Sequence, residues 1–372
     1  MSERMITKFA KNIPIMARLI NKLDFLENEN IELKKRCDDL EEKINNLSQK
    51  DVGLDYRIDD VYHKIFLCSK EMEQLYGTIM TKEQLKDSLK RWYRKETGRI
   101  LDLEYDQGFD EKIQKLKLVY GNEQYKNFDL VCELCDKLAA RGWIKKLIGE
   151  EFLVPLLGKW ERFEEIDFNE LPEKFVLKCN HGSGMNYVIK DKSNIDIYRM
   201  RDMFTYWLNI NYAYYTGFEM QYKNVHPAII AEKYIEELDG NLFDYKVHCF
   251  NGEPLYIQII GDRDLATHEA KQLVYDFNWN KQKWTFGDYP RYEKELERPS
   301  NLGKLYQLCK KLCEDFEYVR VDFYIIESQI LFGEMTFTPG SGLYKYNNDY
   351  TKDVDSFLGK KIDLDNLKNL YM

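Results

Sequence analysis

The chain has 372 residues, which is long enough for two globular domains of ordinary size and an extension. Hydrophobic residues make up 44% of the sequence and aromatic residues 14%, so a folded core is expected. The formal net charge of −9 argues against general nucleic-acid binding, which requires a basic surface.

The sequence predicts no membrane segment. Residues 1–4 lead into no apolar run of signal-peptide length, and no stretch approaches the length of a transmembrane helix. The eight cysteines lie mostly in apolar stretches, and Cys132-x-x-Cys135 would need distant ligands to form a zinc site. We therefore expect a cytoplasmic protein with reduced, mostly buried thiols.

The first fifty residues carry a heptad repeat. The d positions are leucines, at Leu19, Leu26, Leu33, Leu40 and Leu47. Asn30 falls at an a position, where an isolated Asn favours a parallel two-stranded coil in register. We expect residues 1–50 to form a coiled-coil helix that joins a homodimer through residues 15–50. The alternative is an amphipathic helix on the protein's own core, which the unbroken run of leucines at d disfavours.

Residues 51–170 are predicted to form a mostly helical domain. Helical periodicity is clear in residues 80–95 and 127–148, and Pro155 and Gly158 mark a turn region. The segment contains no recognisable catalytic constellation. We expect it to pack against the following domain and to contribute to an acceptor site.

From residue 171 to residue 372 the pattern changes to strands. Phe175–Cys179 is a short β run, followed by a glycine loop at residues 181–186. The further expected elements are strands at 187–190, 228–235, 244–250, 255–261 and 271–277, and helices at 196–209 and 303–316. This order predicts an α+β domain built around an antiparallel sheet.

Lys178 ends the first of these strands, three residues before the glycine loop. A lysine beside a flexible glycine-rich turn can contact nucleotide phosphates while backbone N–H groups close over them. The loop lacks the Gly-Lys-Ser/Thr ending of a Walker A motif and joins two strands, so it predicts a lid. A plain hairpin turn is the alternative.

A hairpin near the C-terminus brings two carboxylates together. Residues 318–326 and 330–337 alternate as strands, and a turn centred on Ser328 sets Asp322 opposite Glu334 and Arg320 opposite Thr336. Facing carboxylates repel unless a cation lies between them or one is protonated. Hard divalent ions such as Mg²⁺ take oxygen ligands of this kind together with substrate phosphates. The alternative is a surface acid pair with Arg320 as its counter-ion.

These pieces together resemble a known family. The order is Lys178, the glycine loop, residues 232–235 (Glu-Lys-Tyr-Ile), Arg320-x-Asp322 and Glu334-x-Thr336, then Pro339-Gly340. This order resembles that of the ATP-grasp superfamily. The amino-acid sequences of residues 175–184 and 333–337 are similar to those of its TupA-like family. The resemblance covers roughly residues 90–360. It implies an ATP-grasp fold and a role in bacterial surface-polysaccharide biosynthesis.

The resemblance implies ATP and Mg²⁺ as cofactors. The residues that it assigns to the nucleotide are Lys178, His181, Gly182, Ser183, Gly184, Glu232, Lys233, Tyr234, Ile235, Asp239 and Lys246. Lys178 and Lys246 would contact phosphates beneath the glycine loop. Glu232 would accept from the adenine amino group, and the backbone of Lys233 and Ile235 would read the ring edge. Asp239 would bind the ribose.

The resemblance also implies a metal site. Asp322 and Glu334 would hold Mg²⁺, and Arg320 would stabilise the transferred phosphoryl group or the anionic intermediate. Thr336 stands where the superfamily usually has Asn, and its hydroxyl would ligate a metal more weakly.

Two further residues are candidates for catalysis. Arg263 could bind an acidic acceptor or a phosphate, or form a loop salt bridge. His181 could aid proton transfer from an amine, or make a structural hydrogen bond in the loop. His248 shares the parity of Lys246, so it could line the same cleft or lie buried and neutral.

The expected activity is that of an ATP-dependent carboxylate–amine ligase. It would form an amide on a uronic acid or related saccharide carboxylate with a small amine, through an acyl phosphate, in capsule or surface-polysaccharide synthesis. Alternatives are a glycosyltransferase or a sugar kinase of the same pathway, and a scaffold with a degenerate nucleotide fold. Retention of both Asp322 and Glu334 disfavours the scaffold.

Overall fold

The computed structural model describes residues 80–105, 108–235, 242–262, 270–287, 289–326, 328–346 and 351–372, without the side chains of 351–353. The chain divides into two units, Met1–Ile79 and Met80–Met372. The expected coiled coil, with its homodimer contact at residues 15–50, lies outside the described residues, as do Asp239 and Arg263. Within the described ranges, no helix is both long and apolar enough to cross a membrane.

The second unit begins with four helices: α4 (Lys82–Thr97), α5 (Phe109–Tyr120), α6 (Phe128–Cys135) and α7 (Ala140–Leu147). Thr81 and Gln84 form a capping box that starts α4, and Gly98 in the left-handed conformation ends it. The predicted helix at 127–148 is split in two. Asp136 Oδ1 accepts from the backbone N–H groups of residues 138 and 139, which ends α6 and begins α7.

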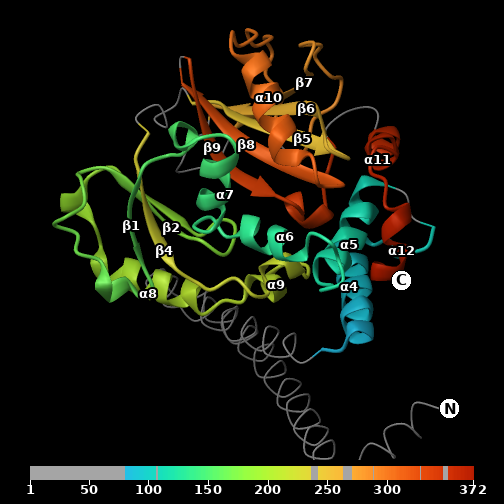
Figure 1. Cartoon of the computed structure of the whole chain (residues 1–372), viewed down its shortest axis with the longest axis horizontal. Coiled ribbons are helices and arrows are strands. Elements are labelled where there is room, and N and C mark those ends of the chain that lie inside the picture. Colours follow the sequence, from blue (N-terminus) through green and yellow to red (C-terminus); the bar gives the residue numbers. More distant parts are fainter. Residues whose placement is uncertain are drawn as a thin grey trace, which may run out of the picture. The chain divides into compact units, whose positions relative to one another are not determined.

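Helix α5, which the periodicity did not predict, is central to this unit. All twelve of its residues are buried, lysines included, because other elements surround it. Helices α11 (Thr351–Gly359) and α12 (Lys368–Tyr371) pack on it, as do the short 3₁₀ helices η4 (Met220–Tyr222) and η6 (Pro339–Gly342). In Figure 1, α4 and α5 lie beside α11 and α12, so the two ends of the unit share one core.

A four-stranded antiparallel sheet has the order β1-β4-β2-β3. Its strands are β1 (Leu156–Trp160), β2 (Phe175–Cys179), β3 (Asn186–Ile189) and β4 (Ile229–Lys233). Helix α8 (Ile197–Leu208) packs on β2, and α9 (Tyr212–Tyr215) follows it. The glycine loop joins β2 to β3 as a hairpin, as expected. Because β1 pairs with β4, the predicted domain boundary at residue 170 lies within one compact unit.

A five-stranded antiparallel sheet has the order β7-β6-β5-β8-β9. Its strands are β5 (Asp244–Phe250), β6 (Glu253–Gly261), β7 (Lys271–Asp276), β8 (Tyr318–Ile326) and β9 (Gln329–Thr336). Helix α10 (Leu302–Cys313) packs on one face, where it buries Leu305, Cys309 and Leu312 against the sheet. The other face carries the polar side chains.

The predicted pairing of β8 with β9 is confirmed. Arg320 lies opposite Thr336, and Asp322 lies opposite Glu334. The turn is one residue shorter than expected, since Ile326 pairs with Gln329, and a bulge at Gly333 restores the register. The bulge keeps Glu334 on the face of Asp322. A side chain at residue 333 would meet the Asp322 carbonyl oxygen at 3.1 Å, which favours glycine there.

The remaining regular elements are short 3₁₀ helices. They are η1 (Glu150–Phe152), η2 (Phe163–Glu165), η3 (Lys192–Asn194) and η7 (Asp365–Leu367). With the two antiparallel sheets and the helices on them, the described chain has the α+β architecture that the sequence predicted.

Candidate functional site

A cavity of about 750 Å³ lies between the glycine loop and the polar face of the five-stranded sheet. Such a volume is in the upper part of the range of about 300–1,000 Å³ that is typical of small-molecule sites. Its charged lining residues, among those that the structure describes, are the cations Lys137, Arg141, Lys178, Lys246 and Arg320 and the acids Glu232, Asp244, Asp322 and Glu334. The cavity therefore suits a large polyanion better than an apolar ligand.

Asp322 is the centre of the charged network. Its carboxylate accepts from Lys246 Nζ at 2.6 Å and from Arg320 Nε and Nη2 at 2.7 and 2.8 Å. Burial alone would raise the pKa of Asp322, but Arg320 and Lys246 outweigh it and hold the pKa below its ordinary value. Asp322 is therefore an anion, held between two cations that could also face a phosphate.

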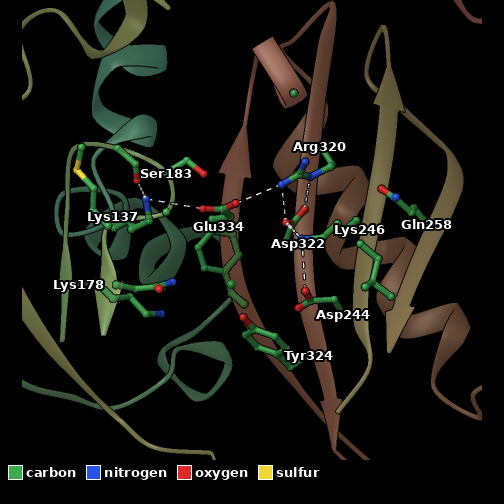
Figure 2. A pocket seen from close by; sticks show the side chains of 18 of the residues that line it. Lys137, Lys178, Ser183, Asp244, Lys246, Gln258, Arg320, Asp322, Tyr324 and Glu334 are labelled. Atoms are coloured by element: carbon green, nitrogen blue, oxygen red, sulfur yellow. Dashed lines mark hydrogen bonds and ion pairs between the residues drawn. The ribbon is translucent and has the colours of Figure 1, made fainter. Parts of the chain in front are cut away.

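Glu334 extends this network toward the glycine loop. Arg320 Nη2 donates to Glu334 Oε1 at 3.2 Å, and Lys137 Nζ lies 3.8 Å from Oε2 (Figure 2). Burial by itself would raise the pKa of Glu334. The nearby cations, Lys137 first and then Arg320, outweigh burial and hold the pKa below its ordinary value. About a third of the side chain, 32%, remains exposed, against 5% for Asp322. Glu334 is thus the more accessible of the two acids.

Lys178 and Glu232 face each other across neighbouring strands of the smaller sheet. Lys178 Nζ donates to Glu232 Oε2 at 2.6 Å, and Arg141 Nη1 donates to Oε1 at 3.1 Å. Both Lys178 and Glu232 line the cavity, as the sequence led us to expect. Each oxygen of the Glu232 carboxylate already accepts a hydrogen bond from one of these cations. An adenine amino group that donates to Glu232 would therefore have to share an oxygen with a cation or displace that cation.

The glycine loop is anchored to the helical region by Lys137. The Lys137 side chain donates to the Gly182 carbonyl at 2.5 Å, and its backbone N–H donates to the Asn180 carbonyl at 3.0 Å. Gly184 has a φ of +75°, which a residue with a side chain would adopt only under strain. A Cβ at position 182 would lie 2.5 Å from the ring of Tyr212. The loop backbone can therefore approach a ligand closely.

Sequence reasoning missed Lys137 and Arg141. Both fall in residues 51–170, where we recognised no catalytic constellation, yet both line the cavity. The local signal is the break between α6 and α7 at Asp136, which leaves Lys137 free of regular helix. That break does not reveal which distant loop the lysine meets. We expected this segment to contribute to an acceptor site, but the sequence did not single out these two residues.

The two histidines that the sequence raised as candidates are both buried. His181 contacts Asn180 Oδ1 at 3.3 Å and the Trp207 carbonyl at 3.0 Å, and burial lowers its pKa. His248 contacts the Tyr318 hydroxyl at 2.7 Å, and burial and Arg320 lower its pKa well below the ordinary value. Neither is among the cavity-lining residues. The contacts of His181 favour its structural reading, and its catalytic role stays a prediction.

The three residues after Glu232 are not among those that line the cavity. Tyr234 is buried, and the backbone N–H of Lys233 already donates to the Pro155 carbonyl at 2.9 Å. Of this motif, only Glu232 is among the residues that line the cavity. The expected role of the backbone of Lys233 and Ile235 toward adenine stays a prediction.

The donor set fits a hard divalent ion that shares its coordination with phosphates. Asp322 and Glu334 lie opposite each other on adjacent strands. Both present carboxylate oxygens, which are ligands of the type that Mg²⁺ takes. Thr336 Oγ1 accepts from Arg320 Nη2 at 3.1 Å and donates to Glu334 Oε1 at 3.2 Å, so it is tied to both. In the described part of the chain, no three His, Cys, Asp or Glu side chains cluster as metal ligands. Phosphate oxygens and water would have to complete the shell.

Several solved structures are similar to the chain at low identity. The D-alanine–D-alanine ligase from Bacillus anthracis complexed with ATP has 18% identity over 56% of each chain, with a TM-score of 0.35. The biotin carboxylase domain of 2-oxoglutarate carboxylase from Hydrogenobacter thermophilus, in complex with MgADP and bicarbonate, has 14% identity over 61% of this chain and 51% of that one, with a TM-score of 0.37. A D-cycloserine synthetase has 11% identity over 63% of this chain and 73% of that one, with a TM-score of 0.34.

These likenesses are too weak to carry an argument about activity, and the chain covers little more than half of the first ligase. No curated protein matches the sequence. A family model does match: the model described as TupA-like ATPgrasp covers residues 111–363, which is more than half of the chain. That range includes every described residue of the charged network in the cavity. The chain therefore belongs to the TupA-like ATP-grasp family.

Proposed function

We propose that the protein is an ATP-dependent carboxylate–amine ligase that releases ADP and phosphate. Proteins of the ATP-grasp superfamily are typically ATP-dependent ligases, and the family membership supports this class. The observation that carries the proposal is the facing pair Asp322 and Glu334, ringed by cations in a cavity beside a glycine loop. Such an arrangement suits phosphoryl transfer, where the main task is to neutralise charge.

ATP would lie with its phosphates beneath the glycine loop. Lys137 donates to the Gly182 carbonyl of the loop, Lys178 donates to Glu232 on β4, and Lys246 donates to Asp322 on the five-stranded sheet. We assign all three to the phosphates, and Glu232 with the following backbone to adenine. Asp322 and Glu334, with Thr336 in support, would hold Mg²⁺, which when bound supplies positive charge between the phosphates.

The reaction would proceed in two steps. A carboxylate oxygen of the acceptor attacks the γ-phosphorus of ATP, ADP leaves, and an acyl phosphate forms. The amine then attacks the acyl carbon, phosphate leaves, and the amine loses a proton as the amide forms. Arg320 lies within reach of both acids and would stabilise the transferred phosphoryl group. The glycine loop would keep water from the acyl phosphate.

The family resemblance supports a uronic acid or related saccharide carboxylate as the acceptor, and a small amine as the second substrate. It also supports a place in capsule or surface-polysaccharide biosynthesis in the cytoplasm. The proposed homodimer rests on the heptads of residues 15–50 alone. For Arg263 and Asp239 the sequence-based roles remain proposals, because both lie outside the described residues.

The proposal is tested with purified full-length protein, ATP, Mg²⁺, a panel of uronic acids and a panel of small amines. We expect ADP and phosphate to appear together only when acid and amine are both present. Glu334→Gln and Lys178→Met should abolish release, whereas Tyr198→Ala, on the exposed face of α8, should not change it. Phosphate retained on the sugar would indicate a kinase. Tight nucleotide-sugar binding without ATP turnover would indicate a glycosyltransferase and overturn the proposal.

A further inference from the structure

The cavity continues past Arg320 on the side away from the glycine loop. In Figure 2, the labelled side chains run from Lys178 and Lys137 through Glu334 and Asp322 to Lys246 and Gln258. Gln258 belongs to β6, two strands beyond β8 in the sheet order. This end of the cavity is lined by Gln258, Phe286, Gly287, Tyr289, Gly340 and Tyr344. Lys137 and Lys178 are assigned to the phosphates at the glycine-loop end, and Lys246, which pairs with Gln258, is assigned to them from β5. The surface beyond Lys246 is therefore open to the acceptor.

One wall of this end is formed by Phe286, Gly287 and Tyr289, and buried glutamines donate to their backbone carbonyls. Gln272 Nε2 donates to the Tyr289 carbonyl at 2.9 Å, and Gln258 Nε2 donates to the Phe286 carbonyl at 3.2 Å and to Gln272 Oε1 at 2.8 Å. Both glutamines are almost fully buried. The ring of Phe286 also stacks on His248 with centroids 3.9 Å apart. Losing either glutamine would leave buried carbonyls without donors, so the segment is firmly positioned.

The opposite wall is the segment 340–344, which helix α5 holds. Lys117 Nζ donates to the Ser341 carbonyl at 2.7 Å, and Gln114 Nε2 donates to the Gly342 carbonyl at 2.9 Å. Residues 340–342 are all left-handed, with φ of +57°, +54° and +65°. Asp110 accepts from the Tyr344 backbone N–H at 3.1 Å. Three buried polar side chains of one helix therefore fix an otherwise unfavourable turn.

The two walls are also bonded to each other. The Gly287 N–H donates to the Lys345 carbonyl at 2.6 Å, and Phe286 forms an isolated bridge with Tyr346. Two segments far apart in the sequence thus form one continuous surface. Such a surface is organised before any ligand arrives, which reduces the entropic cost of binding a rigid ligand.

The surface presents aromatic rings beside a cation. Tyr289 and Tyr344 are both partly exposed in the cavity, and the Tyr344 hydroxyl is hydrogen-bonded to Arg320. A phenol ring offers an apolar face together with a hydroxyl that donates or accepts. Once Asp322 and Glu334 are engaged elsewhere, Arg320 is the cation nearest to a carboxylate placed here.

We propose that Tyr289, Tyr344 and the two fixed walls form a preformed acceptor subsite for a carboxylic acid carried on a ring. The ring lies against Tyr289, its hydroxyl groups reach Tyr344, and its carboxylate lies at Arg320. This assignment rests on the proposed ligase function and adds the residues that select the acid. Tyr289 and Tyr344 contact the substrate, whereas Gln272 is a positioning residue that acts through the Tyr289 carbonyl.

The test measures binding, so it needs no turnover. Full-length protein is saturated with Mg²⁺ and a non-hydrolysable ATP analogue, then titrated by calorimetry with D-glucuronate or with D-gluconate, an open-chain six-carbon sugar acid. We expect glucuronate to bind about tenfold more tightly, a ratio on the scale of one aromatic contact and one hydrogen bond. Tyr289→Ala and Gln272→Leu should both reduce this ratio toward one, without weakening the analogue by more than about twofold. Tyr198→Ala is the matched control for loss of a tyrosine.

Each outcome separates the inference from the proposed function. Failure of the wild-type protein to bind the nucleotide analogue would refute the ligase proposal itself. Normal analogue binding with equal affinity for the two acids, or with no binding of either, would overturn the ring-acid subsite alone. A ratio that survives in Tyr289→Ala would remove that residue from the selection of the acid. If Gln272→Leu does not fold, Tyr289→Ala still decides the matter, because its side chain is partly exposed.

Discussion

Lys117 and Glu219 form a buried charged pair behind the cavity, joined by the hydroxyl of Ser341. Lys117 Nζ donates to Ser341 Oγ at 2.9 Å, and Glu219 is hydrogen-bonded to the same side chain. Burial lowers the pKa of Lys117 to about 7 and raises the pKa of Glu219 to about 7. Removing either partner leaves the other as an uncompensated buried charge, which costs about 3–5 kcal/mol when the remaining group is ionised.

Lys117→Met should make stability fall as the pH rises. Lys117 is the cation that lowers the pKa of Glu219, so in the variant that pKa rises further above its unfolded value of about 4.3. The folded state then retains a proton that the unfolded state releases. The free energy of unfolding therefore falls by about 1.4 kcal/mol per pH unit, or about 3 kcal/mol between pH 5 and pH 7.

Glu219→Gln should give the opposite trend. Without Glu219, the pKa of Lys117 falls below about 7, while its unfolded value stays near about 10.4. Between those values the unfolded state binds a proton that the folded state lacks. The free energy of unfolding of this variant should therefore rise by about 3 kcal/mol between pH 7 and pH 9.

Urea denaturation followed by far-ultraviolet circular dichroism at pH 5, 7 and 9 measures both trends. In the wild type Glu219 makes stability fall between pH 5 and pH 7, and Lys117 makes it rise between pH 7 and pH 9. Lys117→Met should therefore lack the rise above pH 7, and Glu219→Gln should lack the fall below pH 7. Lys90→Met, at an exposed position of α4, is the control for loss of a lysine and should give the wild-type pH trend. Parallel pH trends in Lys117→Met and Glu219→Gln would refute the buried-pair reasoning. So would two variants that differ from the wild type by a constant amount at every pH.

Lys137→Ala should weaken Mg-ATP binding about tenfold or more by calorimetry, since a charge-assisted contact is lost, and unchanged affinity would exclude Lys137 from the phosphate site. Phe109→Ala should lower the free energy of unfolding by about 3–5 kcal/mol in urea, because that fully buried ring packs on four other aromatic rings; a loss below about 1 kcal/mol would contradict the packing. Gly252→Ala should cost more than about 1 kcal/mol in the same assay, because φ is +73° and a Cβ would lie 2.7 Å from the Glu314 carbonyl; a stabilised variant would argue against that turn. Leu26→Pro should halve the mass in light scattering, and an unchanged mass would refute the predicted coiled coil.

The local pattern of the sequence was sufficient for the strands and for the β8–β9 register. Alternation marks which side chains share a face, and a short turn allows few pairings, so Asp322 had to meet Glu334. The bulge at Gly333 could not be foreseen, because it depends on how the strand twists over the sheet. Its effect was to restore the register that the simple pattern implied.

Helix α5 illustrates where local pattern fails. Its sequence has a narrow apolar stripe of Phe109, Ile113, Leu116 and Tyr120, but charged residues stand around much of the remaining circumference. That pattern is typical of a surface helix with one buried side. It is nevertheless buried throughout, because α11, α12, η4 and η6 surround it and supply partners for its lysines and acids. Those partners lie more than a hundred residues away in the sequence.

The sequence by itself singled out six residues that line the cavity: Lys178, Glu232, Lys246, Arg320, Asp322 and Glu334. Each belongs to a short motif whose residue types and spacing predict contact with a phosphate, a metal ion or a nucleotide base. Only the tertiary structure decided that Lys137 and Arg141 join them and that His181 is not part of the cavity lining. It also brought Phe286 and Gly287 to residues 344–346. The physical reason is that these contacts connect segments through packing and buried hydrogen bonds, which no local periodicity encodes.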